Sequence, residues 1–276
     1  MSDRQAIDHA LQSHYAHGEL ASAIDRSLIQ LGKDPANLTV DDLAMIDEFH
    51  IGGRPASLEL FEQCKFGEGM HLLDVGSGLG GPARTCAAAK STTVTGVDLT
   101  PEYIAAATDL SQRVGLSART TFKQGSVLDL PFADGTFDGA YMIHVGMNIP
   151  DKLGLFKQVH RVVKPGAIFG IYDVMLLTDG SLSFPVPWSS KAETSFVETP
   201  SSYRDQLIAA GFEIVSERNR LVAALESIAQ ITRRAQAGTP PILDHRGPGW
   251  KPKADNLQTM LEAGMIGPVE IIAKAA

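Results

Sequence analysis

The positions of apolar residues divide the chain into two parts. Over residues 1–66, apolar residues recur at every third or fourth position, as at Leu20, Ile24 and Leu28, which is the spacing of one helix face. Over residues 67–276, short apolar runs alternate with helical patterns. The pattern therefore predicts an N-terminal helical cap followed by a domain of alternating strands and helices.

Seven apolar runs predict the strands of one sheet. The runs cover residues 70–75, 93–98, 119–124, 137–143, 167–174, 212–219 and 266–274. Helical patterns lie between most of them. This alternation is typical of an α/β fold, in which helices cover both faces of a mainly parallel sheet.

Capping residues and glycines predict where several helices begin and end. Thr39 and Asp42 have the spacing of a capping box. Thr100 and Pro101 are typical of a helix start, and Gly115 is typical of a helix end. We expect a short helix after Thr39 and a longer one between Pro101 and Gly115.

Two segments interrupt the alternation of strands and helices. Residues 176–198 are loop-like, and residues 221–264 contain two helical patterns separated by a loop rich in proline and glycine. Insertions of this kind often form lids or substrate walls, although they can also be surface decoration. We expect both segments to be lid insertions, the second of them a C-terminal helical insertion.

Composition and charge narrow the class of protein. The 276 residues are 44% hydrophobic, which suffices for one large α/β domain with an appended lid. The formal net charge is −8 and the basic residues are dispersed, so we expect no nucleic acid as a partner. Cys64 and Cys86 lack the spacing of metal ligands; we expect two buried thiols and no metal site.

The presence or absence of a signal peptide and of a transmembrane segment bears on the cellular location. The first residues lack the features of a signal peptide, and no apolar run has the length of a transmembrane helix. We therefore expect a cytoplasmic protein without membrane insertion. No pattern settles the oligomeric state, and a homodimer is one assembly that the sequence allows.

A glycine-rich turn follows the first predicted strand. The turn runs from Asp74 through Gly76 and Gly78 to Gly81, and Asp98 ends the next strand. Glycines allow a tight turn and a close approach of a ligand to the backbone, and a carboxylate at the second strand can receive ribose hydroxyls. The pattern predicts a nucleoside cofactor, which at this step is either a nicotinamide dinucleotide or S-adenosylmethionine.

The acid at the start of the turn helps to choose between these cofactors. Asp74 would repel a pyrophosphate, whereas it would attract a sulfonium or an ammonium group. We also find no obvious Tyr-x-x-x-Lys pair for hydride transfer. S-adenosylmethionine is therefore favoured, and a nicotinamide-dependent oxidoreductase is the remote alternative.

Four motifs in order resemble those of class I S-adenosylmethionine-dependent methyltransferases. They are Asp74 to Gly81, Asp98, the segment Gly125 to Phe132, and the segment Arg161 to Gly166. The sequence is most similar to the type 11 branch, which includes ubiquinone/menaquinone and sarcosine/dimethylglycine methyltransferases, over about residues 45–215. The resemblance implies a Rossmann-like sheet of seven strands with the last antiparallel. It also implies methyl transfer to a small-molecule acceptor, leaving S-adenosylhomocysteine.

The resemblance also implies the cofactor-binding residues. They are Asp74, Gly76, Ser77, Gly78 and Gly80 around the methionine part, Asp98 at the ribose, Leu99, Ser126 and Val127 at the adenine, and His144 at the methionine end. Members of the family often have Asp where this chain has Ser126. A hydroxyl is a weaker acceptor than a carboxylate, so we expect a weaker adenine contact here.

Candidates for the acceptor site lie before the cofactor domain and after its strands. His50 and His144 are candidates for catalysis, and each could instead be a structural histidine. The candidates for substrate binding are Tyr15, Asp47, His50, Met147, Asn148, Asp173, Trp188 and Phe196. The sequence leaves N-, C- and O-methylation open. It also leaves open an S-adenosylmethionine-binding protein or cyclase-like enzyme that transfers no methyl group.

Overall fold

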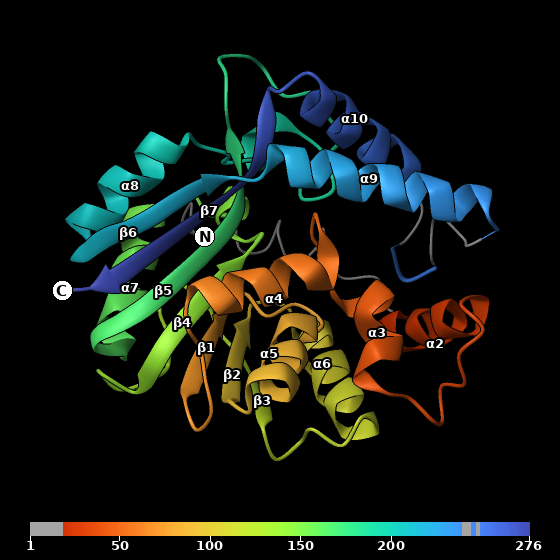
Figure 1. Ribbon diagram of the computed structural model, residues 1–276, viewed down its shortest axis with the longest axis horizontal. Coiled ribbons are helices and arrows are strands. Elements are labelled where there is room, and N and C mark those ends of the chain that lie inside the picture. The colour runs from red at the N-terminus through yellow and green to blue at the C-terminus, as the bar shows by residue number, and fades with distance from the viewer. Residues whose placement is uncertain (1–18, 239–243, 247–248) are drawn as a thin grey trace.

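The computed structural model describes residues 19–238, 244–246 and 249–276, and its centre is one seven-stranded sheet. The strands are β1 (His71–Val75), β2 (Thr93–Asp98), β3 (Thr120–Gln124), β4 (Phe137–Ile143), β5 (Val163–Leu176), β6 (Phe212–Asn219) and β7 (Ile266–Ala275). Their order is β3-β2-β1-β4-β5-β7-β6, and β7 runs antiparallel to both of its neighbours (Figure 1). The predicted Rossmann-like α/β fold is therefore confirmed.

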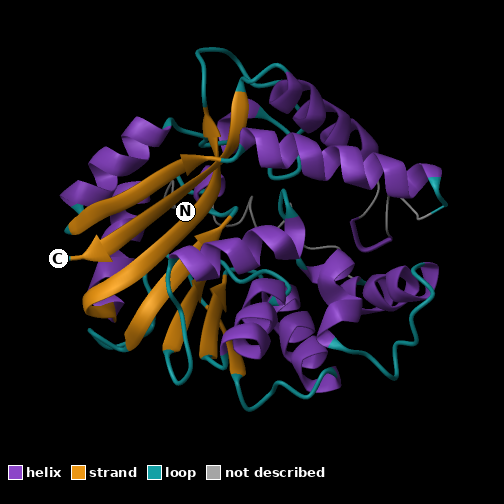
Figure 2. Ribbon diagram, in the orientation of Figure 1, coloured by secondary structure: helices purple, strands orange, loops and turns teal. Residues whose placement is uncertain are grey.

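Helices cover both faces of the sheet (Figure 2). On one face, α4 (Gly53–Gln63) and α5 (Gly81–Lys90) pack on β1 and β4 through an apolar cluster that includes Leu60 and Cys86. On the other face, α7 (Lys152–Val162) and α8 (Pro200–Ala209) pack through Phe156 and Tyr203. Both cysteines are buried free thiols, as predicted.

Two helices near the N-terminus extend over the β2 side of the sheet. They are α2 (Leu20–Gln30) and α3 (Val40–Asp47), whose apolar residues pack against Leu79 and against α6 (Pro101–Arg113). Thr39 and Asp42 form the predicted capping box at the start of α3. No strand occurs in residues 19–66, which agrees with the helical pattern.

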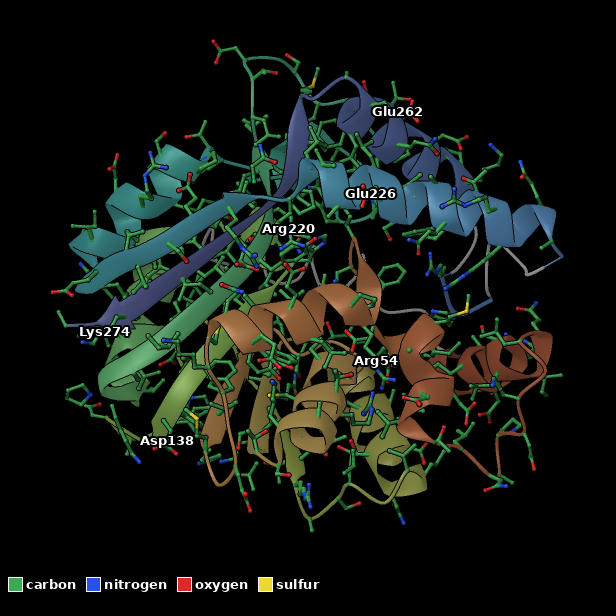
Figure 3. The ribbon with its side chains drawn as sticks, in the orientation of Figure 1. Arg54, Asp138, Arg220, Glu226, Glu262 and Lys274 are labelled. Carbon is green, nitrogen blue, oxygen red and sulfur yellow. The ribbon has the colours of Figure 1, made fainter. Side chains whose placement is uncertain are left out.

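The second predicted insertion contains the helices α9 (Leu221–Gln236) and α10 (Trp250–Glu262). A cluster that includes Trp188, Leu225 and Leu261 packs these helices on the end of β7 and on the loop after β5. Arg220, labelled in Figure 3, joins the start of α9 to α4 through an ion pair with Glu59. Within the described part of the chain, no helix is both long and apolar enough to cross a bilayer.

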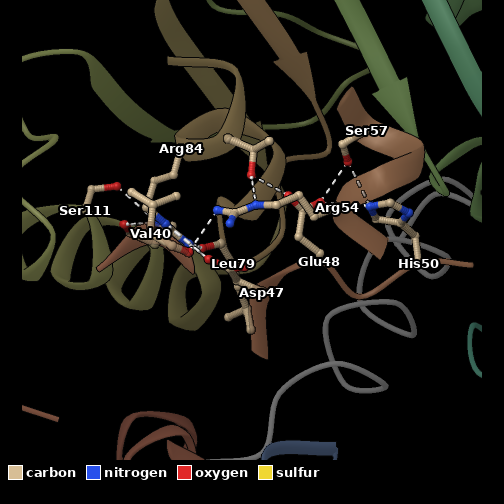
Figure 4. A network of polar contacts seen from close by, with 11 residues as sticks. Val40, Asp47, Glu48, His50, Arg54, Ser57, Leu79, Arg84 and Ser111 are labelled. Atoms are coloured by element: carbon tan, nitrogen blue, oxygen red, sulfur yellow. Dashed lines mark hydrogen bonds and ion pairs between the residues drawn. The ribbon is translucent and has the colours of Figure 1, made fainter. Parts of the chain in front are cut away.

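A buried ion pair fixes α3 against α5. The guanidinium of Arg84 is fully buried and donates to Asp47 Oδ2 through Nε at 3.2 Å and Nη2 at 2.8 Å (Figure 4). Its remaining donors reach the carbonyl oxygens of Leu79 and Ala107 and the hydroxyl of Ser111. Arg84 therefore joins the end of α3, the glycine turn and α6.

We expect the Arg84→Leu variant to lose about 3–5 kcal/mol of unfolding free energy, because it leaves the Asp47 carboxylate buried without its counter-ion. Urea denaturation measures this loss. The matched control is Arg204→Leu, which removes a solvent-exposed pair with Glu217 and should cost less than about 1 kcal/mol. Equal losses in the two variants would contradict this account of the pair.

Candidate active site

A cavity of about 1160 Å³ lies at the carboxyl ends of β1, β2 and β4. It exceeds the usual volume of a site for one small ligand. The predicted site residues that line it are Asp47, His50, Asp74, Gly76, Ser77, Gly78, Asp98, Leu99, Ser126, Val127, His144, Met147, Asn148 and Trp188. Residues of α3, α9 and α10 form its remaining walls.

The glycine turn after β1 forms part of the cavity floor. The backbone N–H of Gly76 donates to the carbonyl of Val97 at 2.8 Å, and its φ of +76° is a conformation that favours glycine. A Cβ on Gly76 would lie 2.5 Å from Val145. In contrast, a Cβ on Gly78 would meet no atom within 4 Å, so the backbone of Gly78 is open to a ligand.

Asp98 stands beside this turn and accepts hydrogen bonds from the backbone. Its Oδ2 accepts from the backbone N–H of Gly78 at 2.9 Å, and its Oδ1 accepts from that of Thr100 at 2.9 Å. The carboxylate is thus held in one orientation at the edge of the cavity.

Asp74 is a buried acid that forms no ion pair among the described residues. Burial raises the pKa of Asp74 to about 8, and the nearby carboxylates of Glu48 and Asp98 act in the same direction. Beside it, the Oγ of Ser77 is buried and has no hydrogen-bond partner in the described structure. This end of the cavity therefore suits a cation with hydrogen-bond donors and disfavours a pyrophosphate.

His50 lines the cavity, but both of its ring nitrogens have neighbours. Nε2 lies 2.9 Å from Glu48 Oε2 and 3.0 Å from the hydroxyl of Ser57, and Nδ1 lies 3.3 Å from the carbonyl oxygen of Ile51 (Figure 4). Burial opposes ionisation of Glu48, yet hydrogen bonds from His50, Thr85 and Ser57 hold its pKa below the ordinary value. The arrangement fixes the imidazole and leaves neither nitrogen directed at a ligand.

His144 follows β4, and unlike His50 it has a ring nitrogen without a hydrogen-bond partner in the described structure. Its φ is +53°, and its ring stacks on Tyr172 with the centroids 5.6 Å apart. Its Nε2 is buried without a hydrogen-bond partner in the described structure. Burial and the neighbouring His50 hold the pKa of His144 well below its ordinary value, so the ring is neutral at pH 7.

Four predicted site residues are not placed at the cavity. Asp173 is fully buried and accepts hydrogen bonds from Tyr203 Oη at 2.8 Å and from the backbone of Val174. Phe196 is held in the loop after β5, where its backbone N–H donates to the carbonyl of Met147. Gly80 forms the N-cap of α5, and Tyr15 lies outside the described residues.

Sequence reasoning missed the far wall of the cavity. There the guanidinium carbon of Arg246 lies 4.9 Å from the ring centroid of Phe49 and 5.0 Å from that of Trp250. These residues come from different segments of the chain, and no sequence pattern predicted their contact. It also missed Glu48, whose spacing from His50 was the one available signal.

A family model matches about a third of the chain. Residues 73–171 match the model of the methyltransferase domain. The matched residues contain the glycine turn, Asp98 and the strand that precedes His144, and this part of the chain is similar to methyltransferase domains. The cofactor expected from the sequence is S-adenosylmethionine. The acidic floor without a counter-ion fits the cofactor's ammonium and sulfonium groups.

The similar proteins include methyltransferases and a cyclase. Sterol 24-C-methyltransferase erg6 of Aspergillus fumigatus is 39% identical over 120 residues, which cover 44% of this chain and 32% of that protein. The chain thus matches about a third of the length of such curated relatives. The [4+2]-cyclase SpnF has a TM-score of 0.67 at 20% identity, covering 96% of both chains. A putative sarcosine dimethylglycine methyltransferase from Galdieria sulphuraria has a TM-score of 0.65 at 20% identity, covering 81% of this chain and 84% of that one.

The raised pKa of Asp74 predicts a loss of stability as pH rises without cofactor. Between the ordinary pKa of 3.8 and about 8, the folded state holds a proton that the unfolded state has lost, so stability falls across this window. The Asp74→Asn variant cannot ionise at this position. We therefore expect the free energy of unfolding of the wild type, relative to that of the variant, to fall by about 1 kcal/mol or more from pH 5.5 to pH 8.5. Urea denaturation at both pH values measures the difference. A constant difference would show that the carboxyl ionises normally.

Proposed function

We propose that the protein transfers a methyl group from S-adenosylmethionine to a small-molecule acceptor. The observation that carries the proposal is a single large cavity in which an acidic, glycine-lined floor adjoins a mainly apolar wall. The floor suits the cofactor, and the remaining volume accommodates a second molecule. The likeness to sterol methyltransferases supports a small acceptor and leaves its identity open.

The floor residues give the cofactor one orientation. The carboxylate of Asp98 accepts hydrogen bonds from the ribose hydroxyls, and Leu99, Ser126 and Val127 border the adenine. Asp74 and the hydroxyl of Ser77 face the methionine end, where an ammonium group neutralises the buried carboxylate. Gly78 allows the cofactor to lie against the backbone, because no atom fills the space where its side chain would be.

The acceptor lies between the methionine end and the far wall. When bound, the cofactor supplies an electrophilic methyl group, which the acceptor attacks in line while the C–S electron pair returns to sulfur. The neutral ring of His144 orients the acceptor, with Met147 and Asn148 beside it. The helices α2 and α3 act as a cap and α9 and α10 act as a lid, which together exclude water from the reaction.

We expect Asp98→Ala to weaken the binding of S-adenosylhomocysteine by about tenfold to a hundredfold, because it removes charge-assisted hydrogen bonds to the ribose. Isothermal titration calorimetry measures the affinity. The matched control is Asp129→Ala, which removes an exposed acid three residues beyond Ser126 and should change the affinity less than about twofold. An unchanged affinity in Asp98→Ala would exclude the ribose contact.

Methyl transfer itself is tested with a labelled cofactor. The protein is incubated with S-adenosylmethionine that carries a deuterated methyl group and with a small-molecule extract of the source cell, and products are sought by mass spectrometry. We expect a labelled small molecule that is absent with Asp98→Ala. Cofactor binding together with turnover of a metabolite that gains no label would instead support the cyclase-like alternative, for which SpnF is a structural precedent.

A further inference from the structure

The charged residues that line the cavity are divided between its two ends. Asp74 and Asp98, which form no ion pair among the described residues, lie at the strand ends. Arg246 and Lys253 lie on the opposite wall, and neither forms an ion pair among the described residues. The floor therefore suits positive charge, and the far wall suits negative charge.

Arg246 is partly buried, and its guanidinium lies against two aromatic rings. Phe49 and Trp250 lie in contact with each other, with their ring centroids 4.9 Å apart, and the guanidinium packs over both rings. Its Nε is buried and has no hydrogen-bond partner in the described part of the chain. Burial lowers the pKa of Arg246 to about 10, so the group still carries its full charge at pH 7.

The acids of the cavity other than Asp74 and Asp98 are engaged elsewhere. Asp47 pairs with Arg84, Glu48 with His50, and Asp255 with Lys251. Asp151 caps α7 through the N–H of Gly154. No described carboxylate forms an ion pair with Arg246. A buried cation with a free donor is costly unless a ligand supplies the missing acceptor.

We infer that the methyl acceptor carries an anionic oxygen group, a carboxylate or a phosphate, which the guanidinium of Arg246 binds at the far wall of the cavity. The inference rests on the proposed methyl transfer, since it describes the substrate of the same site. The planar guanidinium suits both groups, because it can donate two parallel hydrogen bonds. Lys253 adds positive charge to the same wall.

The residues that line the cavity between its two ends indicate the chemistry of the rest of the acceptor. Its side chains are mainly apolar and include Ile51, Met147, Trp188, Ile228 and Leu257. An acceptor that fits this surface has an apolar body between its anionic group and the atom that receives the methyl group. Burial of that body would supply most of the affinity, and Arg246 would select the charge.

Three eight-carbon probes test this charge selection: octanoate, octyl phosphate and octanol. The full-length protein is first saturated with S-adenosylhomocysteine. Binding is then followed by the fluorescence of Trp188 and Trp250, the two tryptophans of the chain, both of which line the cavity. We expect at least one anionic probe to bind about tenfold or more tightly than octanol. The ratio of octanoate to octyl phosphate affinity then tells which anion the wall prefers.

The Arg246→Gln variant tests whether the side chain of Arg246 causes the preference for anionic probes. We expect it to weaken the binding of the preferred anion by about tenfold and to change octanol binding by less than about twofold. The matched control is Arg233→Gln, which removes an exposed arginine of α9 that does not line the cavity and should change neither affinity. Melting temperatures of the variants show whether each is folded.

Two results would overturn the inference. Equal affinities of the wild type for octanol and both anions would show that the wall does not select charge. Equal losses for all three probes in Arg246→Gln would show that Arg246 only holds Phe49 and Trp250 in place. The calorimetric affinity for S-adenosylhomocysteine separates either outcome from failure of the proposed function, because only the latter removes cofactor binding from the wild type.

Discussion

The cost of burying carboxylates determines how this molecule is built. Four of them, Asp47, Glu48, Asp74 and Asp98, line one cavity. The fold compensates the first two with its own side chains, by the Arg84 ion pair and by the hydrogen bonds from His50 to Glu48. Asp74 and Asp98 receive no cation from the described residues. The proposed binding of S-adenosylmethionine brings a cation to these two acids.

The compensated acids hold the N-terminal helices on the cofactor domain. Gly81 shows how close this contact is, because a Cβ there would lie 2.2 Å from the carbonyl oxygen of Asp47. The last glycine of the motif is thus needed for packing against α3, whereas Gly78 leaves room for a ligand. The same turn therefore serves cofactor binding and attachment of the cap, and a change at Arg84 would disturb both.

The sequence predicted the sheet and the cavity floor well, because both depend on local patterns. The run over 93–98 became β2 with the predicted ends, and the glycine turn follows β1 directly. Asp173 shows the limit of this reasoning. It was expected at a strand end, but β5 continues to Leu176 and pairs with β7, which places Asp173 inside the sheet beneath Tyr203.

The far wall could not be predicted for a different physical reason. Phe49 lies in the turn after α3, Arg246 lies between α9 and α10, and Trp250 begins α10. Phe49 meets the other two only through tertiary packing, and no periodicity or motif encodes a contact across such a separation. The charge of Arg246 was visible in the sequence, but the absence of a neighbouring carboxylate was not. The floor therefore follows from sequence, whereas substrate selection depends on how the insertion folds back.

Proton release on cofactor binding tests the central claim most directly. S-adenosylmethionine is titrated into the protein at pH 7 in two buffers with different ionisation enthalpies, with Asp74→Asn as the control. Because Asp74 with a pKa of about 8 is mostly protonated at pH 7, a bound ammonium should displace about one proton from the wild type and almost none from the variant. Equal proton release by the two proteins, or none by the wild type, would contradict the account.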